Sequence, residues 1–66
     1  MSVHKVIEIL ANSNKSWEDA AQQALNEASK SIHNIESVYI QDFMVRCTDN
    51  KISEYRVNAK ITFKVD

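Results

Sequence analysis

Apolar residues recur at three- and four-residue intervals between Ser16 and His33, and this spacing predicts one amphipathic helix. Ser16 is the predicted N-cap, and Asp19 is its predicted capping-box partner. Because small side chains allow close approach to another surface, we expect this helix to pack on a β-sheet. More than half of the predicted packing face is alanine: Trp17, Ala20, Ala21, Ala24, Leu25, Ala28 and Ile32.

Three further segments have the patterns of strands. Val3–Leu10 is rich in β-branched residues and carries apolar residues on both faces. Ile52–Val65 alternates apolar and polar residues, which predicts a strand with one apolar face toward the helix. Ile35–Cys47 is the third segment, and apolar residues lie on both of its sides. Its alternation predicts one face with Val38, Ile40 and Met44 and another with Tyr39, Phe43, Val45 and Cys47.

The order of these segments predicts an α+β fold of the β-α-β-β type over residues 1–66, as a single domain. We expect a three-stranded antiparallel sheet, with the last strand in the centre, packed on one helix. The chain has no glycine and no proline, so the turn at residues 48–51 needs other residues with positive φ. Asp49 and Asn50 are predicted to fill that role, and Asn34 is predicted to do so after the helix.

A chain of 66 residues hides too little surface to be very stable alone. Cys47 is the single cysteine, so the chain forms no internal disulfide, and no Cys/His cluster has zinc spacing. One helix covers only one face of a sheet, yet the segment Ile35–Cys47 is apolar on both. These observations predict that the chain associates with copies of itself.

Composition and motifs exclude several classes of function. The formal net charge of −1 argues against a nucleic-acid-binding protein. No apolar run is long enough to span a membrane and no signal-peptide pattern is present, so we expect a cytoplasmic protein without a membrane partner. No catalytic triad, paired carboxylates or glycine-rich phosphate loop is present, so we expect no enzymatic activity. Trp17 is expected to pack at the start of the helix or in a subunit contact.

The sequence resembles the dodecins, a family of very small bacterial β-α-β-β proteins. The resemblance rests on VHKVIEI, on SWEDAAQQAL followed by ASKSIHNI, and on DNKISEYRVNAKITFKVD, in this order and spacing. It implies a hollow homododecamer that binds and stores small molecules. The implied cofactor is a flavin (FMN, riboflavin or FAD), held in pairs between subunits.

Two positions depart from the flavin-binding pattern of that family. Ser37 stands where a tryptophan stacks on the flavin, and Arg56 stands where a glutamine hydrogen-bonds the flavin edge. The resemblance therefore assigns Ser37 and Arg56 to a ligand site and predicts weak flavin binding. Arg46 is a third candidate, because it could line an intersubunit surface. An arginine at such a site can bind a phosphate or carboxylate with two hydrogen bonds.

An assembly without an organic ligand is the alternative reading, either purely structural or binding calcium or magnesium. Some dodecins that lack the tryptophan are associated with cation binding. Hard cations need several oxygen ligands, but the sequence assigns no ligand set. His4 and His33 lack metal-ligand spacing. The acidic candidates for a site shared between subunits are Glu8, Glu18, Asp19, Asp42 and Asp49.

Overall fold

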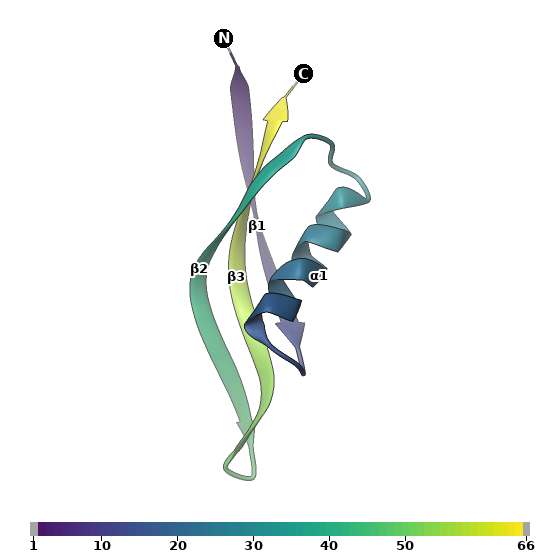
Figure 1. The fold of residues 1–66 in the computed structure, drawn as a ribbon. Helices are drawn as coiled ribbons and strands as arrows, with labels where there is room; N and C mark the ends of the chain where they lie inside the picture. Colours follow the sequence, from purple (N-terminus) through teal and green to yellow (C-terminus); the bar gives the residue numbers. More distant parts are fainter. Residues whose placement is uncertain (1, 66) are drawn as a thin grey trace.

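A computed structural model describes residues 2–65 and shows a β-α-β-β chain (Figure 1). The strand order in the sheet is β1-β3-β2, and both pairings are antiparallel. The predicted fold class and the central position of the last strand are confirmed. The elements in chain order are β1 (Val3–Ser13), α1 (Trp17–Ser29), β2 (Ile35–Thr48) and β3 (Lys51–Val65).

Strands β2 and β3 each extend one residue further into the turn than predicted, and two other element boundaries differ by more than one residue. Strand β1 continues three residues beyond Leu10, because its pairing with β3 extends to Ser13 opposite Tyr55. The helix ends at Ser29 rather than His33. Its last turn tightens, since the Lys30 N–H donates to the Glu27 carbonyl three residues back. The predicted positive φ values are confirmed: Asn34 62°, Asp49 53° and Asn50 64°.

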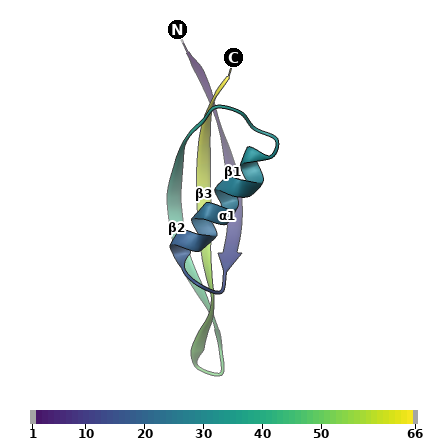
Figure 2. The same cartoon turned by 45° about the vertical axis from the view of Figure 1, so that its right-hand side comes forward.

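The helix packs on one face of the sheet (Figure 2). A narrow contact of small residues forms the core. Each of the core residues is at most 4% exposed. The alanine stripe thus does what the pattern predicted, because short side chains let the helix backbone approach the central strand. The core residues are Ala20, Ala24 and Ala28 of α1 and Val57, Ala59 and Ile61 of β3.

Enlarging the alanine stripe is expected to destabilise the fold. Ala24 is 2% exposed, so Ala24→Leu overfills a close-packed contact and should cost about 1–3 kcal/mol of unfolding free energy. Ala21→Leu is the matched control, because Ala21 is only half-buried on the same helix and should cost less. Urea unfolding of both variants at one protein concentration measures the difference. Equal losses would contradict the narrow-stripe packing.

A bulge in β2 changes which residues face the helix. Ile40 pairs with Ala59, but the next register pair is Asp42 with Asn58, so Gln41 is an extra residue. The side-chain alternation therefore shifts by one position beyond Gln41. The predicted grouping of β2 is wrong beyond the bulge: Phe43 and Val45 lie on the helix side with Val38 and Ile40, and Met44 lies opposite.

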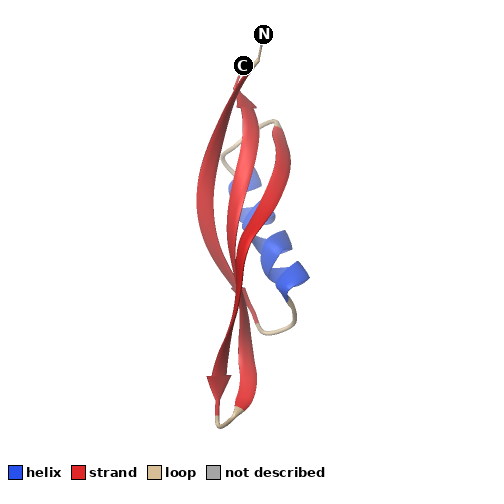
Figure 3. Ribbon diagram, turned by 90° about the vertical axis from the view of Figure 1, so that its left-hand side faces the viewer, coloured by secondary structure: helices blue, strands red, loops and turns tan. Residues whose placement is uncertain are grey.

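No element of the described chain covers the other face of the sheet, which we call the open face. Figure 3 shows the three strands in front of the helix from that side. Large apolar side chains remain exposed there: Val6 56%, Leu10 67%, Tyr39 64% and Met44 42%. The sequence-based expectation that one helix leaves apolar surface uncovered is confirmed, and this surface is available to other molecules.

Hydrogen bonds of two serine hydroxyls and one carboxylate fix the start of the helix. The Ser16 hydroxyl accepts from the Asp19 N–H at 3.0 Å, which confirms Ser16 as the N-cap. The second half of the predicted capping box is wrong. The Asp19 carboxylate accepts from the Ser13 hydroxyl at 2.6 Å and from Gln23 at 3.0 Å. The Ser13 hydroxyl instead accepts from the Ser16 N–H at 3.4 Å. Ser13 thereby ties the end of β1 to the helix.

Acidification is expected to weaken this junction. The Ser13 hydrogen bond, followed by that of Gln23, lowers the pKa of Asp19 below its ordinary value of 3.8. A carboxyl whose pKa is lowered by folding contributes stability above its unfolded pKa, and this contribution is lost as pH falls through the folded value. Asp19→Asn should therefore reduce the loss of melting temperature between about pH 6 and about pH 3. An unchanged pH profile would contradict this role.

Candidate ligand site on the open face

The three residues predicted for a ligand site all lie on the open face. Ser37 pairs with Thr62, and Arg46 pairs with Glu54. Thr62 and Glu54 lie an even number of residues from Arg56 along β3, so all of these side chains are on the same face of the sheet. Thr62 and Arg56 are six residues apart, which is roughly 20 Å along a strand. Glu54 and Arg56 are adjacent positions on this face. The sheet therefore brings Arg46 near Arg56 and leaves Ser37 apart, so one small ring can contact both Ser37 and Arg56 only if two chains supply them.

A pocket of about 220 Å³ surrounds Arg56 on the open face. It spans the sheet, because its residues belong to two adjacent cross-strand rows. One row is Leu10–Asn58–Asp42 and the other is Asn12–Arg56–Met44. We call this the Arg56 pocket, and its lining residues are Leu10, Asp42, Met44, Arg56 and Asn58.

Arg56 is held in place by a neutral partner. Its Nε donates to the Asn12 Oδ1 at 2.7 Å. Within residues 2–65 no carboxylate lies within 4.0 Å of its guanidinium nitrogens. This arrangement fixes the side chain through one nitrogen and leaves the two terminal nitrogens to bind an acceptor from another molecule.

Arg46 has a different environment. Its Nη1 lies 3.5 Å from the Glu54 Oε2, and the two side chains are 61% and 33% exposed. An exposed ion pair of this kind contributes about 0–1 kcal/mol to stability. Arg46 does not line the Arg56 pocket. The prediction that it lines an intersubunit surface stays a prediction.

Asn58 was not singled out from the sequence, where it appears as one polar residue of an alternating strand. Its Oδ1 atom is buried and has no hydrogen-bond partner among the described residues. A buried acceptor without a partner costs about 1–3 kcal/mol. The unpaired atom is the signal that sequence alone cannot give, because it depends on burial by the surrounding strands.

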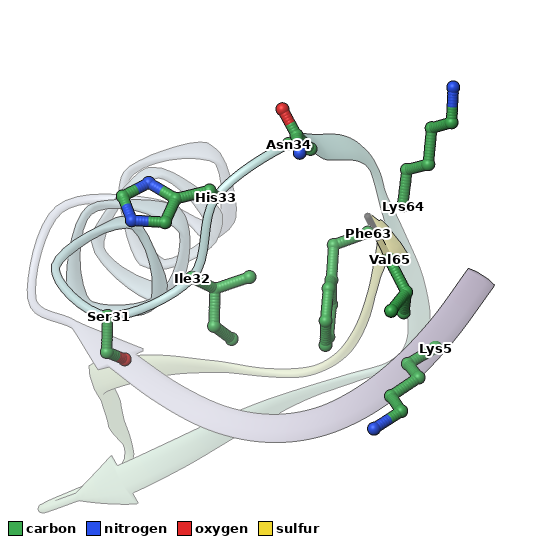
Figure 4. A pocket seen from close by; sticks show the side chains of 8 residues that line it. All are labelled: Lys5, Ser31, Ile32, His33, Asn34, Phe63, Lys64 and Val65. Carbon is green, nitrogen blue, oxygen red and sulfur yellow. The ribbon is translucent and has the colours of Figure 1, made fainter. Parts of the chain in front are cut away.

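A second pocket, of about 270 Å³, lies on the other side of the molecule, where the connection after α1 crosses the ends of β1 and β3. Figure 4 shows Ile32 and Phe63 facing one another, with Lys64 directed away. The Asn34 carbonyl accepts from the Lys64 N–H at 3.0 Å and joins the connection to β3. None of the predicted site residues lines this pocket: its lining is Lys5, Ser31, Ile32, His33, Asn34, Phe63, Lys64 and Val65.

Trp17 packs within the chain, as expected. Its ring meets Phe43 edge-on at 5.5 Å and Tyr55 edge-on at 5.2 Å between ring centroids. Its Nε1 donates to the Met44 carbonyl at 3.3 Å. These contacts lie on the helix side of the sheet, so the tryptophan does not reach the Arg56 pocket.

The predicted acidic candidates do not converge. Among residues 2–65 no group of three His, Cys, Asp or Glu side chains could hold a metal ion. His4 Nε2 instead contacts Glu36 at 2.7 Å. Asp42 alone of the acidic candidates lines the Arg56 pocket. No helix in the described part of the chain is both long and apolar enough to cross a membrane.

A single helix on one face of a three-stranded antiparallel sheet, with a small pocket on the other face, defines a small α+β fold. The sequence model of the Dodecin family matches residues 3–66, and the chain belongs to this family. Dodecins are binding and storage proteins that assemble as dodecamers. The resemblance inferred from the sequence is confirmed.

Individual relatives agree with this assignment. Calcium dodecin from Mycobacterium tuberculosis is 38% identical over 66 residues, which cover 98% of this chain and 92% of that protein. The crystal structure of a calcium dodecin from the same organism, described as a calcium-chelating antigen, matches with a TM-score of 0.84 and 33% identity. The match covers 98% of this chain and 93% of that chain. A mutant of Thermus thermophilus dodecin matches with a TM-score of 0.95 and 23% identity, covering 100% of this chain and 98% of that chain. Dodecin from Streptomyces davaonensis matches with a TM-score of 0.91 and 23% identity, covering 98% of this chain and 96% of that chain.

Proposed function

We propose that this chain forms a homododecameric shell that binds and stores a small molecule in the Arg56 pocket. The observation that carries the proposal is the position of Arg56. The family resemblance assigns this residue to the ligand site, and its side chain lines a pocket and is held by Asn12. The pocket volume of 220 Å³ is below the roughly 300–1,000 Å³ of a complete ligand site. A second chain completing the site accounts for the difference.

Flavin is a poor ligand for this pocket. No aromatic residue is among those that line it. The family's stacking position is occupied by Ser37, which has no ring to cover a flavin. We therefore expect the stored molecule to be of another chemical class. We further propose a cytoplasmic location, with no catalytic role and no nucleic-acid or membrane partner.

Extraction of the native particle tests this proposal. Purified protein is denatured, and the released small molecules are identified by mass spectrometry against a mock purification. We expect a molecule in stoichiometric amount and an absorbance spectrum without the flavin bands. An Arg56→Met variant that still assembles is the control, and it should release much less. A wild-type particle that releases nothing would contradict a storage function.

Calcium binding is the second candidate, and the 38%-identical calcium dodecin favours it. Because the described residues of one chain form no three-ligand cluster, the cation would be shared between chains and would stabilise the assembly. A ligand present at a hundred times its dissociation constant adds about 2.7 kcal/mol to the free energy of unfolding.

Chelation is therefore expected to lower the melting temperature if calcium is bound. Added calcium should restore it, and magnesium at equal concentration should restore it less if the site prefers seven or eight oxygen ligands. Differential scanning fluorimetry at one protein concentration measures both changes. No response to chelator or to either ion would exclude a stabilising cation and leave the small-molecule proposal.

A further inference from the structure

Two features of the Arg56 pocket are not explained by Arg56 itself. Asp42 carries a charge, and no described residue gives it a hydrogen bond or an ion pair. Its cross-strand neighbour Asn58 has a buried Oδ1 without a partner. The two residues lie side by side on β2 and β3, and the exposed Asp42 carboxylate is the acceptor that is open to a ligand. One end of the pocket therefore presents an unpaired carboxylate.

The other end of the pocket has the opposite chemistry. The Arg56 guanidinium is bound by Asn12 through Nε alone, so its terminal nitrogens form an edge that matches a carboxylate. Leu10 flanks Asn58 and Met44 flanks Arg56, so apolar side chains lie beside both polar ends. The pocket thus combines an acceptor end, an apolar wall and a donor end.

We propose that the Arg56 pocket binds an extended aliphatic zwitterion, with its ammonium group at Asp42 and its carboxylate at Arg56. This inference rests on the proposed storage function and names its ligand class. An ammonium group has three donors, which suit the Asp42 carboxylate. Methylene groups between the two charges contact Leu10 and Met44.

The spacing of the two ends sets the length of the ligand. Asn58 and Arg56 are two residues apart, or about 7 Å along β3. Asn12 draws the guanidinium toward β1, whereas Asp42 is on β2, so the charged ends are separated by about 7–10 Å once the strand spacing is included. An α-amino acid carries its two charged groups on the same carbon atom and cannot reach both ends.

Four probes of related structure test the inference: 6-aminohexanoate, its isomer norleucine, hexanoate and hexylamine. Norleucine has the same atoms as 6-aminohexanoate, but its charges are adjacent. The readout is the methyl signal of Met44 in protein labelled with 13C-methyl methionine, assigned by loss of that signal in Met44→Leu. We expect 6-aminohexanoate to bind about tenfold more tightly than each of the other three, because only it satisfies both ends.

Two variants test the assignment of each end. Asp42→Asn should reduce 6-aminohexanoate binding to the level of hexanoate and leave hexanoate unchanged. Arg56→Met should reduce it to the level of hexylamine. Lys60→Gln is the control, because Lys60 is on the same face but does not line the pocket, and it should change none of the affinities. Particle mass by light scattering confirms that each variant assembles.

The outcomes separate this inference from the proposed function. Equal binding of 6-aminohexanoate and norleucine, or no effect of Asp42→Asn, would overturn the zwitterion assignment. If the native particle releases a molecule that is not a zwitterion, the storage function stands and the ligand class is wrong. If none of the four probes binds and the native particle releases nothing, both proposals fail.

Discussion

Light scattering is expected to give a particle of twelve times the 7.6 kDa chain mass. The isolated chain is far from compact: its radius of gyration is 13.5 Å, against about 10.8 Å for a globular chain of this length. Its principal extents are 52 × 20 × 13 Å, and the β2–β3 hairpin continues past the end of β1 (Figure 1). Such a chain leaves apolar surface on the open face that only another molecule can cover.

The stability of the protein should depend on this association. The melting temperature is expected to rise with protein concentration, because folding and assembly are linked by mass action. A particle that stays monomeric or dimeric throughout the micromolar range would contradict the dodecamer. A concentration-independent melting temperature with an intact dodecamer would indicate instead that the subunits unfold only within the shell.

Riboflavin fluorescence is expected to show little or no quenching by the unmodified protein. Burying a tryptophan against a flavin contributes about 4 kcal/mol from apolar area and stacking together, and Ser37 supplies neither. Arg56 also replaces a neutral amide by a charge that needs a partner. Relative to a dodecin with tryptophan and glutamine at these positions, the loss is on the order of 1,000-fold in affinity.

The double variant Ser37→Trp with Arg56→Gln should recover quenching better than either single variant. Because the two positions are roughly 20 Å apart along one sheet, a shared ligand must take them from different chains. Shells refolded from a mixture of the two single variants should therefore also recover part of the quenching. Tight riboflavin binding by the unmodified protein would show that the site assignment is wrong. Recovery in the double variant but not in mixed shells would place both residues in one chain's site.

Much of the fold follows from local patterns in the sequence. The spacing of Ala20, Ala24 and Ala28 identified the helix face, and strict alternation identified β3 and its buried side. Asp49 and Asn50 could be assigned to the turn because no glycine was present to take positive φ. These predictions succeeded because each depends on neighbours within a few residues of the chain.

The features that failed depend on pairing between distant residues. The bulge at Gln41 is invisible in the sequence, since it exists only through the register of β2 against β3, and it misplaced Met44, Phe43 and Val45. Family resemblance selected Arg56, but it did not select Asn58, whose unpaired oxygen is a consequence of burial. Pocket chemistry was therefore predictable only at the residue that the family pattern marks.

The central claim is that a stored small molecule occupies the Arg56 pocket, and the methyl spectrum of Met44 tests it most directly. Protein labelled with 13C-methyl methionine is stripped of ligand by unfolding, refolded into particles, and titrated with the molecule released by the native particle. We predict a saturable shift of the Met44 signal that is absent in Arg56→Met particles of the same mass. A native particle that yields no molecule, or one whose ligand binds without moving the Met44 signal, would contradict the claim.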